Sequence, residues 1–82
     1  MKLDWKNAND ESGNKSKWAD LSPYMRVWIG FRNKAIVLCV ANRGVPDQFF
    51  EDSDWTELCT GRSIKQLVSL AENINWTPYV GH

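Results

Sequence analysis

The chain has 82 residues, of which ten are basic and ten are acidic, so its formal net charge at neutral pH is zero. This length fits one small domain near the lower limit for a single hydrophobic core, and a hydrophobic content of 43% excludes general disorder. The zero net charge hides two opposed halves. Residues 1–44 carry eight basic and four acidic residues, a balance of +4, whereas residues 45–82 carry two and six, a balance of −4. Aromatic residues accompany the charge in both halves, a combination typical of binding surfaces.

The composition also restricts the class of protein. The longest apolar run, Ala35 to Ala41, is far shorter than the roughly 20 residues of a membrane-spanning helix. Residues 1–20 are polar throughout and lack the apolar stretch of a secretory signal. Cys39 and Cys59 are predicted to be free thiols, so we expect a cytoplasmic protein. Most of the five tryptophans are expected in the core, because each can bury roughly 150–250 Å².

The N-terminal part is strongly polar. Residues 6–17 read KNANDESGNKSK and contain one alanine as their only apolar residue. Such a segment buries too little apolar surface to offset the entropy of ordering it. We therefore predict a flexible loop or mobile arm here, with Trp18 and Leu21 anchoring the return of the chain to the core.

A β-hairpin is predicted over residues 24–32 and 35–42, because both segments are rich in β-branched and aromatic residues. Asn33 and Lys34 form an acceptable two-residue turn, and this turn fixes the register. Three apolar pairs then share one face, namely Phe31 with Ile36, Ile29 with Leu38, and Val27 with Val40.

The C-terminal part contains an acidic segment followed by a helix. Gln48 to Leu58 fits either a short third strand or a short helix, in which Ser53 would cap a turn that includes Glu57. Apolar residues from Ile64 onward recur with helical spacing, which predicts an amphipathic helix over residues 61–74, with Thr60 as N-cap and Asn75 as its end. The predicted fold class is α+β, a small single domain over residues 1–82 in which the hairpin packs against this helix.

Catalytic and metal chemistry find little support in the residue pattern. His82 is the only histidine and the cysteines are twenty residues apart, so we expect neither a metal nor a cofactor. Nothing in the sequence marks one acidic residue for burial and another for exposure, which acid–base catalysis by two carboxylates requires. We therefore expect no enzyme activity. The only special motif is Thr60, Gly61, Arg62 and Ser63 after Cys59, where a helix N-terminus could bind an anion or activate the thiol. It resembles a tyrosine-phosphatase loop in part, but two residues instead of five separate the cysteine from the arginine.

Binding is therefore the predicted function. One contact patch is expected on the hairpin face that carries basic and aromatic side chains, and a second on the acidic segment. The first comprises Arg26, Trp28, Arg32 and Lys34, and the second Phe50, Asp54 and Trp55. These residue types favour a protein partner, and a homodimer through the hairpin edge is a further option. The alternative is single-stranded nucleic acid held by stacking and phosphate contacts, against which the pI of about 6.5 argues.

Size and composition resemble those of small accessory proteins of phages and mobile elements, many of which inhibit or regulate a host or defence complex. The resemblance implies an inhibitor or regulator. One question stays open at this point: if residues 47–57 fold over the basic hairpin face, the two charged halves neutralise each other within the molecule.

Overall fold

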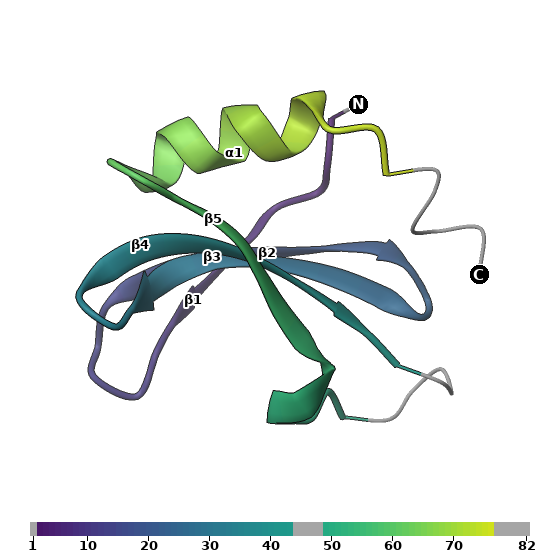
Figure 1. Ribbon diagram of the computed structural model, residues 1–82, viewed down its shortest axis with the longest axis horizontal. Coiled ribbons are helices and arrows are strands. Elements are labelled where there is room, and N and C mark those ends of the chain that lie inside the picture. The colour runs from purple at the N-terminus through teal and green to yellow at the C-terminus, as the bar shows by residue number, and fades with distance from the viewer. Residues whose placement is uncertain (1, 44–48, 77–82) are drawn as a thin grey trace.

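Consecutive segments of the chain pair in order to form one antiparallel sheet, with strand order β1-β2-β3-β4-β5 (Figure 1). The computed structural model describes residues 2–43 and 49–76. The elements are β1 (Lys6–Asn9), β2 (Lys15–Ser22), β3 (Met25–Arg32), β4 (Ala35–Asn42), the 3₁₀ turn η1 (Asp52–Asp54), β5 (Trp55–Gly61) and α1 (Ile64–Asn73). The α+β class is confirmed, but the predicted hairpin is the centre of a five-stranded sheet rather than a two- or three-stranded one.

The central hairpin, β3 and β4, has the predicted register. Val27 pairs with Val40, Ile29 with Leu38, and every residue from Met25 to Arg32 has its expected partner. The turn residues Asn33 and Lys34 have φ angles of 53° and 65°. Positive φ at both central positions is the geometry whose twist matches that of the flanking strands, so the turn itself fixes which side chains share a face.

The polar segment 6–17 is not a loop or arm, and this prediction needs correction. Its two ends belong to β1 and β2, which pair with each other, and β2 continues the sheet by pairing with β3. Asp10 organises the connection, because its Oδ1 accepts hydrogen bonds from the backbone N–H groups of Ser12 and Asn14 at 2.9 and 2.8 Å. Gly13 supplies the left-handed position with φ of 82°. Turn chemistry and pairing with the neighbouring strand β3 therefore order a segment that has little apolar surface.

The acidic segment forms a tight turn and then the fifth strand. η1 is closed by a reciprocal pair of contacts between Glu51 and Asp54, in which Asp54 Oδ2 accepts from the Glu51 backbone N–H at 2.9 Å. Ser53 lies inside this turn and does not cap a helix, so the strand alternative was correct from Trp55 onward. Gln48 lies outside the described residues.

Helix α1 begins later than predicted. Ser63, not Thr60, is its N-cap, and Ser63 Oγ accepts from the Gln66 backbone N–H at 3.1 Å. The Gln66 side chain in turn accepts from the Arg62 N–H at 2.7 Å. Thr60 and Gly61 remain in β5, where they pair with β4. The helix ends at Asn73, two residues before the predicted stop.

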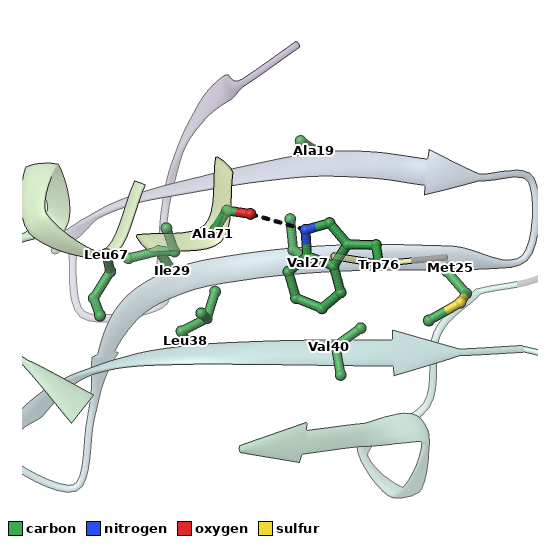
Figure 2. Close-up of a cluster of buried hydrophobic side chains, with 9 residues drawn as sticks. All are labelled: Ala19, Met25, Val27, Ile29, Leu38, Val40, Leu67, Ala71 and Trp76. Atoms are coloured by element: carbon green, nitrogen blue, oxygen red, sulfur yellow. Dashed lines mark hydrogen bonds between the residues drawn. The ribbon is translucent and has the colours of Figure 1, made fainter. Parts of the chain in front are cut away.

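The core lies between α1 and one face of the sheet (Figure 2). α1 packs across β3, β4 and β5, and its buried residues Leu67 and Ala71 meet the apolar pairs of the hairpin. Phe31 is an exception to the predicted core, because it lies at the turn end of the sheet and is 46% exposed. Trp76 completes the core from beyond the helix: it is 2% exposed, and its Nε1 donates to the Ala71 carbonyl at 2.9 Å.

Candidate functional site

The sheet face opposite α1 carries aromatic and arginine side chains side by side. Alternation along β3 turns Val27 and Ile29 toward the helix, so Arg26 and Trp28 point to the other face. Trp18 on β2 pairs with Trp28, and Trp55 on β5 pairs with Ala41 of β4. Four neighbouring strands thus contribute to one surface on the side of the sheet away from α1.

Part of this surface is a stacked ladder of cations and rings. The Arg26 guanidinium lies 4.0 Å from the ring centre of Trp18 and 4.9 Å from that of Phe50, and the Arg43 guanidinium lies 4.4 Å from Phe50. The ring of Phe50 in turn lies 5.6 Å from that of Trp55. Contacts of this kind stabilise by about 0.5–1 kcal/mol at exposed sites. Phe50 therefore brings the start of the acidic segment onto the basic face.

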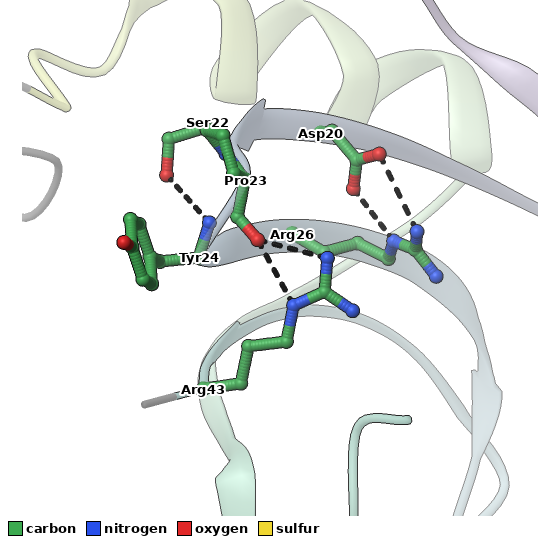
Figure 3. Close-up of polar contacts among 6 residues, drawn as sticks. All are labelled: Asp20, Ser22, Pro23, Tyr24, Arg26 and Arg43. Carbon is green, nitrogen blue, oxygen red and sulfur yellow. Dashed lines mark hydrogen bonds and ion pairs between the residues drawn. The ribbon is translucent and has the colours of Figure 1, made fainter. Parts of the chain in front are cut away.

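Polar contacts hold the two arginines of the ladder in place (Figure 3). Arg26 donates to both carboxylate oxygens of Asp20, at 2.7 and 3.4 Å. Arg43 donates through Nε and Nη2 to the Pro23 carbonyl at 3.0 and 2.8 Å. Their guanidinium groups are thus already committed to intramolecular partners. The carboxylate that holds Arg26 belongs to the same half of the chain, so this ion pair does not join the two oppositely charged halves.

Beside these stacked residues, the same face has a hollow of about 240 Å³ lined by Trp28, Arg32, Cys39 and Trp55. Its shape depends on Gly30, because a Cβ there would clash with Cζ2 of the Trp28 indole and would lie 2.5 Å from Cη2 and 2.9 Å from Cε2. The indole therefore lies across the backbone of Gly30. Glu57, paired with Cys39 in the register, adds a carboxylate on the β5 side. The hollow is thus apolar at its base, with an arginine and a glutamate near it.

The thiol of Cys39 at the base of the hollow is not an activated nucleophile. Burial raises its pKa above the ordinary value of 9.0, and although nearby Arg32 lowers the pKa, burial dominates. The thiol is therefore protonated near neutral pH, whereas nucleophilic attack requires the thiolate. Cys59, predicted to sit at a helix N-terminus, lies in β5 four residues before the N-cap Ser63, and it packs against the core.

We predict that Cys39 in a Cys59→Ser variant reacts with a thiol reagent at neutral pH much more slowly in the folded protein than in denaturant. Burial raises the pKa of the folded Cys39 thiol, so the protonated thiol favours the folded state. This contribution to the free energy of unfolding is fully present below pH 9.0 and is lost as the pH rises through the folded pKa. Urea unfolding of this variant at several alkaline pH values, compared with a variant that also carries Cys39→Ala, measures this loss. Equal labelling rates for folded and unfolded protein would contradict the prediction.

The structure unites the two predicted contact patches. Trp28 and Arg32 from the first patch and Trp55 from the second line the same hollow, and Phe50 stacks beside it on Arg26. Lys34 is exposed in the β3–β4 turn, outside the lining. Asp54 closes the η1 turn.

The predicted register had placed Gly30 and Cys39 on this face without counting them among the contact residues, and sequence reasoning missed Trp18 and Arg43. Trp18 had been assigned to anchoring the chain in the core. The alternation of Trp18 and Asp20 with Ala19 and Leu21 was the available signal for a strand with one aromatic and one apolar face.

The residues of the predicted anion site, 60–63, have structural roles at the end of β5 and the start of α1. Thr60 and Gly61 are in β5, and a Cβ on Gly61 would lie 2.7 Å from the Leu67 side chain. At the start of α1, the Arg62 backbone N–H donates to the Gln66 side chain, and the Ser63 side chain accepts from the Gln66 backbone N–H. Within residues 2–43 and 49–76, no group of three or more histidine, cysteine or acidic side chains is placed to hold a metal ion.

Two further findings concern the chain as a whole. Comparison with protein-family models, with curated proteins and with solved structures finds no match. In the described part of the chain, no helix has both the length and the apolar character needed to cross a membrane.

Proposed function

We propose that this chain is a small non-enzymatic protein-binding module whose contact surface is the hollow formed by Trp28, Arg32 and Trp55. The observation that carries the proposal is the position of two half-buried tryptophans and an exposed arginine around one apolar depression. Tryptophan and arginine are the residues that most often dominate the energy of protein interfaces. A depression of this size accepts one apolar side chain of a partner, with Arg32 available to pair with a carboxylate beside it.

The charge around the hollow favours protein over nucleic acid. Arg26 and Arg43 are stacked on Phe50 and hydrogen-bonded within the chain, which leaves Arg32 as the cation of the lining. Glu57 stands on the β5 side and would repel phosphate. In the cytoplasm such a module would act as an inhibitor or regulator of a larger complex, as the small accessory proteins of phages do. The predicted homodimer is a separate matter: both edges of the β3–β4 hairpin are paired within the sheet, so the outer strands β1 and β5 are the edges left for it.

The decisive experiment is affinity capture from a lysate, followed by binding measurements with the purified captured protein. We expect Arg32→Glu and Trp55→Ala each to weaken that binding at least tenfold, in line with the roughly 2 kcal/mol of a hot-spot residue. Lys2→Glu is the matched control, because it makes a charge change of the same sign at an exposed position outside the hollow. Thermal unfolding checks that each variant is folded. Unchanged binding by folded Arg32→Glu and Trp55→Ala would overturn the proposed surface.

Single-stranded nucleic acid is the second candidate function, because Trp18, Trp28 and Trp55 share the open face of an antiparallel sheet. Exposed aromatic rings on such a face are a common platform for unpaired bases. Fluorescence anisotropy with single- and double-stranded oligonucleotides at two salt concentrations tests it. Binding that falls steeply with salt and is lost in Trp28→Ala would replace the protein partner by nucleic acid, and no binding at low salt would remove this alternative.

A further inference from the structure

A groove separates helix α1 from the β1–β2 hairpin, on the side of the sheet away from the hollow. α1 packs across β3, β4 and β5, and one helix is only about 10–12 Å wide. Five strands spaced about 4.8 Å apart are wider than that, so room remains over the first two strands. The groove has a volume of about 670 Å³, within the range of roughly 300–1,000 Å³ typical of ligand pockets.

The groove is positively charged although the chain is neutral. Lys15 and Lys17 of β2 and Lys65 of α1 line it, and none of the lining residues is acidic. Lys17 Nζ donates to Asn7 Oδ1 at 2.7 Å, which holds one ammonium group at the wall. The ion pairs found among the described residues, Lys6–Asp4 and Arg26–Asp20, involve none of these lysines. Three cations that form no ion pair with an acid in residues 2–43 and 49–76 therefore line one groove.

The helix side of the groove is apolar. Ile64 and Val68 are one helical turn apart, are half-buried and border the groove. No aromatic ring is among the lining residues, so the groove lacks the surfaces on which nucleic-acid bases stack. A fitting ligand carries negative charge together with an aliphatic side chain, which is the chemistry of an acidic peptide rather than of a nucleic acid.

We propose that this groove binds an acidic peptide segment of a protein partner. Carboxylates of the segment pair with Lys15, Lys17 and Lys65, and one of its aliphatic side chains packs against Ile64 and Val68. This second site is independent of the hollow around Trp28, and the two sites on opposite faces would allow one small domain to contact two parts of a complex.

Fluorescence anisotropy with a labelled peptide of glutamates interrupted by leucines tests the proposal. We expect saturable binding that weakens as salt rises, and no binding of the same peptide with glutamine at each glutamate. Lys15→Glu combined with Lys65→Glu should weaken binding at least about tenfold. The control, Lys2→Glu combined with Lys34→Glu, has the same net charge but changes exposed lysines outside the groove, and should stay within about twofold.

The outcomes separate this site from long-range attraction and from the hollow. Equal weakening by the two double variants, or no binding of the glutamate peptide at low salt, overturns the groove as the site. Tighter binding of an oligonucleotide that displaces the peptide overturns the ligand class. Should the groove double variant fail to fold, Lys65→Ala, at an exposed helix position, serves in its place, with an expected weakening of about threefold. Trp28→Ala should leave peptide binding intact, so failure of the proposed function would not affect this result.

Discussion

Replacing Trp76 by alanine should lower the free energy of unfolding by about 3–5 kcal/mol, the range for removing a buried tryptophan. Its indole is 2% exposed and packs in the cluster that α1 forms with the sheet. The loss is a large share of the roughly 5–15 kcal/mol that stabilises a typical domain. Urea unfolding followed by circular dichroism measures it. A large part of the variant population should therefore be unfolded at modest urea concentrations.

The control for this prediction is Trp76→Phe, which keeps an aromatic ring in the same space. It removes the donor to the Ala71 carbonyl, but that carbonyl also accepts from the Ile74 N–H at 3.3 Å and so keeps a partner. We expect Trp76→Phe to cost clearly less than the alanine variant, about 1–2 kcal/mol. A loss below about 1 kcal/mol in Trp76→Ala would show that the residue does not complete the core.

The central hairpin could be predicted because its information is local. Asn33 and Lys34 set the turn, and the apolar residues of both strands alternate in agreement with the register of that turn. Two independent local signals therefore pointed to one structure. The strands β1 and β2 carry no such signal in their first residues, because Lys6, Asn7 and Asn9 are polar on both faces. These strands are ordered by the turn at Asp10 and Gly13 and by backbone pairing with β3, and the polar residue types of β1 do not reveal either.

The beginning of the helix illustrates a choice between two good signals. Thr60 and Ser63 are both residues that cap helices well. Only Ser63 is followed three residues later by a glutamine, and this spacing identifies the true start. The joining of the two predicted contact patches into one surface could not be predicted from a local signal. It depends on the stacking of Phe50 on Arg26, a tertiary contact between residues 24 positions apart in the sequence. The types of residue at the site were predictable, but their assembly into one surface was not.

Replacing Gly30 by alanine should destabilise the protein by about 1–3 kcal/mol, the range for forcing an extra methyl group into a packed site. Gly30 is buried in a central strand, where glycine is otherwise unfavourable. The Trp28 indole occupies the space that a Cβ would need. The indole therefore accounts for the glycine at this position. Both residues serve the proposed function, because the indole that lies across Gly30 lines the hollow.

A double-mutant cycle tests that coupling. In a Trp28→Ala background the obstacle is gone, so Gly30→Ala should cost little or even stabilise, because alanine loses less backbone entropy than glycine. An equal cost in both backgrounds would mean that something other than the indole crowds Gly30. Binding gives the second measurement. Gly30→Ala leaves Arg32 and Trp55 unchanged but displaces the indole, so a partner that recognises the hollow should bind it at least tenfold more weakly. Full affinity in a folded Gly30→Ala protein would mean that the partner does not contact the indole as it lies across Gly30, which would overturn the hollow as the contact surface.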